Sequence, residues 1–325
     1  MYDFEKAASK SKILLKLAGN GLLVAEGHAH RAQRKMLNPA FSIQSIRAMV
    51  PLMIGPCYTL RDQWIQMISN NHTEYTEIEV SRGLSLATLD IIGITAFGQD
   101  FGSLAHYGTG KMNRLSKAYF KLFSQGMSLM SFLTLAFPVL GLLPTKENRE
   151  NAEMLRWLKE ESEALVEAGL QRHAEEKKSG KASQYQDLLA LMVNLIDKDT
   201  GKGLTKEELR HQCLTFLAAG HETTSNTLCW CLWLLAQHQD IQDKLRSEIL
   251  VLFKDNKISD YNAVNALPYL DHVCCETLRL IPTVPHPVRV SRMPVVLGPY
   301  VLPKNTFFYI PPAISHHSKE IWGRT

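Results

Sequence analysis

Apolar residues recur three and four positions apart along most of this chain, which is the pattern of amphipathic helices. Stretches rich in glycine, proline and asparagine, which are typical of turns, separate the segments with this pattern. β-Branched residues alternate with turn residues only from Val288 onward and predict a small sheet or hairpin. The fold class is therefore mainly α with a small β region. The expected helices cover residues 27–37, 45–69, 79–97, 146–178, 205–238, 240–254 and 266–281.

Two of these helices carry strong end or break signals. Pro51 and Pro56 are expected to break or kink the helix over residues 45–69, because proline removes a backbone hydrogen bond. Gly98 is expected to end the helix over residues 79–97.

The run from Leu122 to Thr145 contains no charged residue, so a hydropathy window flags it as a candidate membrane span. Pro138 and Gly141 argue against one continuous helix. We expect a buried helix followed by an apolar loop, with residues 137–143 exposed. The alternative is a loop that dips into a membrane surface. The N-terminus has no apolar run of signal-peptide length, so nothing there predicts a membrane anchor.

Composition narrows the class of protein. The 325 residues are 45% hydrophobic and 21% charged, with a net charge of +4, and this weak field does not favour a nucleic-acid partner. The six cysteines have no C-x-x-C spacing. We expect them to be reduced and buried, as in a protein that faces the cytosol. They are Cys57, Cys213, Cys229, Cys231, Cys274 and Cys275.

The segment from Thr205 to His238 is the most informative. Thr205 and Glu208 form a capping-box pattern at its start, and a helix of this length would span roughly 50 Å. Its flanks are apolar, but its centre reads Ala219-Gly-His-Glu-Thr-Thr224. Hydroxyl and carboxyl side chains compete for backbone hydrogen bonds, so such a centre is unusual inside a helix.

This polar centre is a candidate catalytic site. Gly220 would let a flat ligand or an oxygen molecule approach the backbone, and Glu222 and Thr223 could relay protons beside that gap. A kinked core helix with solvated polar residues explains the pattern equally well. A zinc site at His221 is excluded, because Ser225 stands where the second histidine should lie one turn on.

Glu276 and Arg279 form a second motif. They are three positions apart in a largely apolar segment, so both lie on one helix face and should form a buried ion pair. Alone, a surface ion pair would be the commonplace explanation.

The segment over residues 27–37 is a third motif. His30 and Arg34 share one helix face and could bind an anion, while Arg31 and Lys35 share a neighbouring face. An exposed basic helix is the alternative.

The order and spacing of these motifs resemble the cytochrome P450 family, of the microsomal type and fungal-like, over about three hundred residues. Residues 219–224 resemble its A/G-G-x-D/E-T-T/S signature, residues 276–279 its E-x-x-R pair, and residues 30–34 its W/H-x-x-x-R helix. Three further segments are similar to family elements: residues 88–98 to a core helix, Arg289 to a propionate-binding arginine, and residues 316–323 to an H-x-x-x-x-x-W-G turn.

The resemblance implies a haem-thiolate monooxygenase that inserts one oxygen atom from O2 into a small apolar substrate, and a role in secondary metabolism. It implies that His30, Arg34 and Arg289 pair with haem propionates. It also implies that Glu222 and Thr223 relay protons and that Gly220 admits oxygen.

The same resemblance implies partners and a location. The electron donor would be a reductase of the NADPH-cytochrome P450 reductase type, to which Arg31 and Lys35 would offer a basic patch. The intact protein would lie at the endoplasmic reticulum membrane, on the cytosolic face, with a membrane surface contact and no nucleic acid.

The chain departs from the family pattern at its end, Trp322-Gly-Arg-Thr325. The family continues into an F-x-x-G-x-R-x-C loop whose cysteine ligates the iron, and none of the six cysteines lies in such a loop. We therefore expect a single partial domain over residues 1–325, truncated at both ends, as a split gene model or a remnant. A catalytically inactive fragment without the axial cysteine remains open, as does a helical scaffold without a cofactor.

Overall fold

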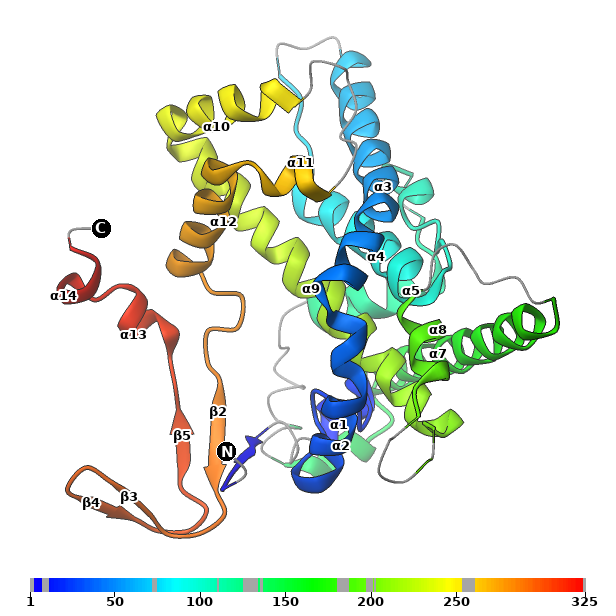
Figure 1. The fold of residues 1–325 in the computed structure, drawn as a ribbon, viewed down its shortest axis with the longest axis vertical. Helices are drawn as coiled ribbons and strands as arrows, with labels where there is room; N and C mark the ends of the chain where they lie inside the picture. Colours follow the sequence, from blue (N-terminus) through cyan, green and yellow to red (C-terminus); the bar gives the residue numbers. More distant parts are fainter. Residues whose placement is uncertain are drawn as a thin grey trace.

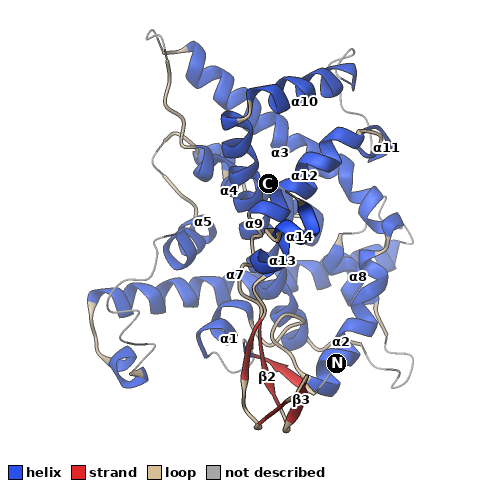
Figure 2. Ribbon diagram, turned by 90° about the vertical axis from the view of Figure 1, so that its left-hand side faces the viewer, coloured by secondary structure: helices blue, strands red, loops and turns tan. Residues whose placement is uncertain are grey.

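The computed structural model describes residues 3–7, 12–71, 75–109, 111–124, 134, 137–179, 187–196, 201, 203–252 and 261–323. Helices dominate and strands are few, which confirms the predicted fold class (Figures 1 and 2). The longer helices are α2 (Gly27–Leu37), α3 (Ile43–Ser69), α4 (Val80–Phe97), α7 (Lys146–Ser179), α9 (Lys206–Gln237), α10 (Gln239–Leu252) and α12 (Pro268–Leu280). The shorter ones are α1 (Lys12–Ala18), α5 (Arg114–Tyr119), α8 (Leu188–Asn194), α11 (Tyr261–Asn265), α13 (Pro312–His316) and α14 (Lys319–Trp322).

The helix α9 runs through the middle of the helical body (Figure 1). The predicted capping box is present at its start, because the Thr205 side chain accepts from the Glu208 backbone and the Glu208 side chain accepts from the Thr205 backbone. A core of leucines from four helices packs around its first half: Leu89, Leu158, Leu189, Leu209 and Leu217. This core holds α9 against α4, α7 and α8.

The helix α4 is the second central element. It ends at Gly98, as predicted, which adopts a left-handed conformation with φ of 60°. Asp90 fastens α4 to the following loop, because its two carboxylate oxygens accept from the backbone of Ser103 and Leu104 at 2.8 and 2.9 Å. Among the described residues, α4 alone is long and apolar enough to cross a membrane, and 61% of it is buried inside the structure. It therefore serves as a core helix.

The helix α3 continues through both of its prolines, so the predicted break is wrong. Proline disfavours a helical residue before it by a clash with that residue's Cβ. Gly55, which precedes Pro56, has no Cβ, and this removes the clash at the second proline.

The β region predicted after residue 288 is confirmed. Strands β1 (Phe4–Lys6), β2 (Val288–Ser291) and β5 (Phe307–Tyr309) form one antiparallel sheet in the order β1-β2-β5. Strands β3 (Val295–Leu297) and β4 (Tyr300–Leu302) form a hairpin. Strand β1 joins the beginning of the chain to its far end, and the pairing sets Lys6 opposite Arg289. In Figure 1, β2 and β5 run as an arm with α13 and α14 at one end and the β3–β4 hairpin at the other.

The uncharged run is helical at both of its described ends. Residues Phe120–Ser124 form a π-helix and residues Pro138–Leu142 a 3-10 helix, while residues 125–133 and 135–136, where the buried helix was expected, lie outside the described residues. Phe137 is not helical. It is 63% exposed, and Val139 is 73% exposed. The predicted exposure of residues 137–143 is thus confirmed at these side chains and at Leu143.

Candidate functional site

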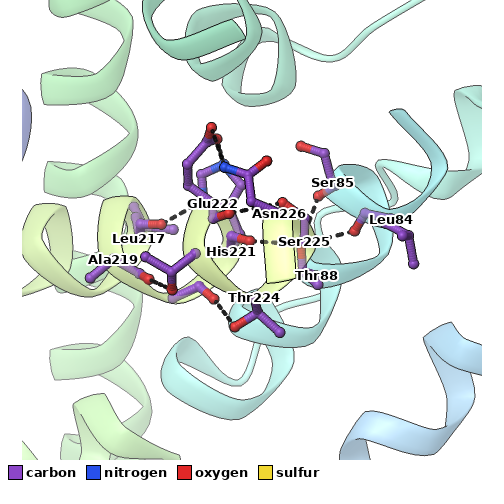
Figure 3. A network of polar contacts seen from close by, with 12 residues as sticks. Leu84, Ser85, Thr88, Leu217, Ala219, His221, Glu222, Thr224, Ser225 and Asn226 are labelled. Atoms are coloured by element: carbon purple, nitrogen blue, oxygen red, sulfur yellow. Dashed lines mark hydrogen bonds and ion pairs between the residues drawn. The ribbon is translucent and has the colours of Figure 1, made fainter. Parts of the chain in front are cut away.

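The polar centre of α9 stays helical because its hydroxyl groups bond to its own backbone. Thr223, Thr224 and Thr227 each donate to the carbonyl four residues earlier, at 2.7, 2.9 and 2.9 Å. Such bonds satisfy a hydroxyl inside a helix without breaking it. Figure 3 shows this centre beside α4, whose Thr88 donates to the carbonyl of His221 at 3.1 Å. The two central helices are therefore linked at the candidate site.

The open side of Gly220 faces α4. A Cβ built at this position would lie 2.6 Å from Cδ1 of Ile92, so the space on that side of the glycine is already filled. This contact does not test the role of Gly220 in admitting oxygen, which stays a prediction. The missing side chain of Gly220 allows α9 and α4 to approach closely.

Glu222 has the properties expected of a proton-carrying acid. Burial raises the pKa of its carboxyl above the usual value, and a hydrogen bond from Asn226 partly opposes that shift. The Asn226 amide donates to Oε1 of Glu222 at 3.3 Å, while Oε2 lies 3.8 Å from Nε2 of His221. No hydrogen bond joins Glu222 to Thr223 in the described part of the chain. The proton relay through both residues therefore stays a prediction.

A cluster of positive charge lies where α2 meets the sheet. Burial, then the charges of Lys6 and Arg34, lower the pKa of His30, and Glu26 opposes them. Burial also lowers the pKa of Lys6, which Glu26 raises and Arg289 and Arg34 lower. Arg34, Arg289, His30 and Glu26 thus all lie within electrostatic reach of Lys6. We call Lys6, His30, Arg34 and Arg289 the cationic cluster.

Sequence reasoning found three members of this cluster and missed Lys6. Lys6 stands in a strand of three residues, and only its pairing with β2 brings it beside Arg289. Its ammonium group donates to the carbonyls of Leu22 and Ala25 at 3.0 and 3.2 Å, which holds it near α2. No local pattern could reveal this neighbour. Asn226, by contrast, could have been found, because it lies four residues after Glu222 on the same helix.

Glu276 and Arg279 form the predicted ion pair, with Nε and Nη2 of Arg279 each 2.7 Å from a carboxylate oxygen of Glu276. Arg279 is buried, donates to the carbonyl of His316, and lies 5.0 Å from the centre of the Trp322 ring. The Glu276 side chain, however, is 53% exposed. The expectation of a fully buried pair is wrong for Glu276, because only Arg279 faces α13.

The same contact fixes the segment that resembles the family's W-G turn. The indole of Trp322 donates to the carbonyl of Ser315 at 3.0 Å, and His316 lies against the carbonyl of Arg279 at 3.1 Å. The end of the described chain is thus tied to α12.

The six cysteines differ in burial and in the ease with which they ionise. All six are free, but Cys57, Cys274 and Cys275 are exposed, so the expectation that they are buried is wrong for these three. Burial raises the pKa of Cys229 and raises that of Cys213 to about 12. A thiol with a raised pKa remains protonated at neutral pH and is a poor metal ligand.

The residues therefore fit one part of a haem site and not another. Four cations, Lys6, Arg34, Arg289 and Arg292, outnumber the two described carboxylates beside them, Glu5 and Glu26. This excess of positive charge suits the two carboxylates of haem. The described residues include no group of three or more histidine, cysteine, aspartate or glutamate side chains that could hold a metal ion. The cationic cluster contains no cysteine, so the thiolate ligand that the family resemblance implies is not one of its groups.

Comparison with known proteins gives a consistent result. The profile of the family described as Cytochrome P450 matches residues 3–324. The chain is 34% identical to "Cytochrome P450 monooxygenase 128" of Postia placenta, with 99% of this chain and 62% of that protein aligned. It is 30% identical to "Cytochrome P450 monooxygenase sphH" of Aspergillus fumigatus, with 99% and 59% aligned. The chain thus spans about three fifths of the length of these relatives.

The fold is also similar to that of a solved structure. The "cytochrome P450DA heme domain" superposes with a TM-score of 0.79 at 22% sequence identity, over 98% of this chain and 65% of that one. This likeness supports the fold assignment.

Proposed function

Because the chain belongs to the cytochrome P450 family, we propose that it forms two parts of a haem monooxygenase. One is a carboxylate clamp, which is the cationic cluster, and the other is α9, the helix that would lie on the oxygen side of the haem. The observation that carries this proposal is the cationic cluster, in which basic groups from α2 and β2 lie within electrostatic reach of Lys6 in β1. Bound haem would supply the activation of O2 for the insertion of one oxygen atom into a substrate.

The cationic cluster would hold the haem by its two propionates. Arg34 and Arg289 can each offer two parallel N–H donors to a carboxylate. Lys6 is close enough to lower the pKa of His30, so the cluster is destabilised by its own repulsion until an anion arrives. Binding a dianionic group relieves that repulsion.

Glu222 and Thr223 would manage protons on α9. Burial shifts the pKa of Glu222 toward neutral pH, and an acid whose pKa lies nearer to neutral pH can both hold and release a proton. The Thr223 hydroxyl donates to the carbonyl of Ala219, so its oxygen can still accept a hydrogen bond.

The substrate and partners follow from the family and from exposed groups. We propose a small apolar substrate, O2, and an electron donor of the NADPH-cytochrome P450 reductase type. Arg31 and Lys35 are exposed on α2 and would present positive charge to an acidic partner. The exposed side chains of Phe137, Val139 and Leu143 would contact a membrane surface, at the cytosolic face of the endoplasmic reticulum.

A second candidate is favoured by the cysteines. Because burial raises the pKa of Cys213 and Cys229, we propose that residues 1–325 bind haem without cysteine ligation and are inactive by themselves as a monooxygenase.

An absorption spectrum separates these possibilities. Haem is added to the purified 325-residue chain, which is then reduced and exposed to carbon monoxide. We expect bound haem without the red-shifted Soret band of thiolate ligation. A red-shifted band would overturn the conclusion about the cysteines. Failure to bind haem at all would favour a cofactor-free helical protein.

A further inference from the structure

The buried side of α9 carries a histidine that the proposed function does not use. His221 is 1% exposed and packs edge-on against Tyr119 of α5, with the ring centres 4.5 Å apart. Its Nδ1 lies 2.6 Å from the carbonyl oxygen of Leu217. A carbonyl oxygen only accepts, so Nδ1 carries the hydrogen. The neutral ring therefore presents a lone pair at Nε2.

This lone pair faces the carboxyl of Glu222. Nε2 has no hydrogen-bond partner among the described residues and lies 3.8 Å from Oε2 of Glu222. The other oxygen, Oε1, accepts from Asn226, as Figure 3 shows. Asn226 thus holds the carboxyl in an orientation that leaves Oε2 toward the histidine. Two acceptor atoms that face each other in a largely buried place repel unless a proton lies between them.

No described Lys or Arg side chain lies close enough to pair with Nε2 of His221 or with Oε2 of Glu222. Burial lowers the pKa of His221 to about 4, and burial raises that of Glu222. Among the described residues, no Lys or Arg contributes to either shift.

The other groups around the pair are weak acids or neutral. The phenol of Tyr119 has a pKa raised by burial, and the pKa of Cys229 is raised by burial and slightly by Glu222. The hydroxyl of Thr88 in α4 bonds to backbone carbonyls, those of Leu84 and His221. None of these described groups carries a positive charge that would pair with the Glu222 carboxylate.

We propose that His221 and Glu222 form a dyad that holds one proton between Nε2 and Oε2, and that His221 is a positioning residue that keeps Glu222 ready to donate. A small rotation of either side chain closes the 3.8 Å separation to hydrogen-bond length. The dyad rests on the proposed function, in which Glu222 and Thr223 relay protons on α9.

The proton balance is simple. When Glu222 donates, its O–H bond breaks and the proton passes to the Thr223 side of α9. The carboxylate then regains a proton from water, because the Glu222 side chain is 24% exposed while His221 is closed to solvent. The family signature leaves the position of His221 open, so the dyad is a property of chains with histidine there.

The test follows the protonation of Glu222 in the haem-free 325-residue chain. The infrared band of its protonated carboxyl, identified by its loss in Glu222→Gln, is titrated between about pH 4 and 8. We expect His221→Phe to lower the midpoint by about one pH unit or more, because the acceptor for the acid proton is lost. His221→Gln retains an acceptor and should shift it less. His211→Phe, the same change elsewhere on α9, is the control and should leave the midpoint unchanged.

A measurement on the unmodified chain tests the dyad even if the His221→Phe variant fails to fold. Nitrogen NMR of labelled histidine should show Nε2 of His221 as a hydrogen-bonded acceptor whose signal moves with the midpoint of Glu222. The dyad would be overturned by an Nε2 signal that stays constant through the titration of Glu222. An unchanged Glu222 midpoint in folded His221→Phe would overturn it as well. Because no haem is present, these results are independent of whether the carboxylate clamp binds haem.

Discussion

At the scale of single residues, burial and neighbouring charges set the protonation of the groups that would meet a cofactor. Burial lowers the pKa of His30, and Lys6 and Arg34 lower it further, so its ring is neutral at pH 7. The carboxylates of a bound ligand would oppose this effect and raise the pKa again. Ligand binding is therefore coupled to proton uptake at His30.

This coupling gives a pH dependence with a definite sign. Because the free chain holds His30 neutral and the bound anion favours its charged form, the affinity for haemin should rise as the pH falls from about 7.5 to 6. Titrations of haemin at several pH values measure this slope. His30→Gln should flatten it, while His28→Gln, an exposed histidine on the same helix, should leave it intact. An affinity that falls with decreasing pH would contradict the coupling.

Arg279 is the second residue with a testable environment. Arg279→Ala removes three hydrogen bonds from a buried guanidinium and leaves the carbonyl of His316 without this donor. Because Glu276 remains in contact with water, we expect a loss of about 1.5–3 kcal/mol rather than the larger cost of a fully buried pair. Urea denaturation measures it. Arg246→Ala, which breaks an exposed pair with Asp243 at the same spacing, should change stability little.

The site was predictable wherever its residues lie one turn apart. Spacing alone placed His30 with Arg34 and Glu276 with Arg279, since neighbours on a helix face follow from the helical repeat. The burial of each member was not predictable, because it depends on elements far away in the sequence. Lys6 was missed for the same reason, and so was the packing of Ile92 against Gly220, because these residues meet only in the folded chain.

At the scale of elements, the close packing of α9 on α4 supports the candidate site. Gly220 meets Ile92 from one side of this contact, and Thr88 bonds to the backbone of His221 from the other. A shift of α4 would therefore move the whole polar centre of α9.

Gly220→Ala tests this packing. The added methyl group would lie 2.6 Å from Cδ1 of Ile92, so we expect a destabilisation of about 1–3 kcal/mol from overpacking, in spite of alanine's better helix propensity. Thermal or urea unfolding provides the value. The matched control is the double variant with Ile92→Ala, in which the new methyl group has room. An additive double-mutant cycle would show that the two residues do not meet.

Long helices were predictable to within a few residues because their ends carry local signals. Glu208 and Thr205 marked the start of α9, and Gly98 marked the end of α4. The short helices α1, α5 and α8 were missed, since one or two turns are too few to show a period. The continuity of α3 through Pro56 depends on its neighbours and on Gly55, which a rule for single prolines does not include.

At the scale of the whole molecule, much apolar surface faces solvent. Many large exposed apolar side chains lie on the arm of β2 to β5 and the helices that follow it, among them Val296, Tyr300, Val301, Phe307, Tyr309 and Ile314. Apolar surface of this extent favours association.

The isolated chain should therefore self-associate. We expect oligomers or aggregates at micromolar concentration in light scattering after size exclusion, together with strong binding of a hydrophobic dye. Val301→Lys and Ile314→Lys on the arm should reduce both signals, whereas Lys159→Ala on the charged face of α7 should not. A monodisperse monomer that binds no dye would contradict this picture of the surface.

The central claim is that Lys6, His30, Arg34 and Arg289 bind the carboxylates of haem, and a comparison of haemin with its dimethyl ester tests it most directly. The ester keeps the ring and the iron but lacks both charges. We expect the chain to bind haemin at least about tenfold more tightly than the ester, and Arg34→Ala and Arg289→Ala each to narrow that ratio. Equal affinities for the two compounds, unchanged in both variants, would show that the cationic cluster is not a carboxylate clamp.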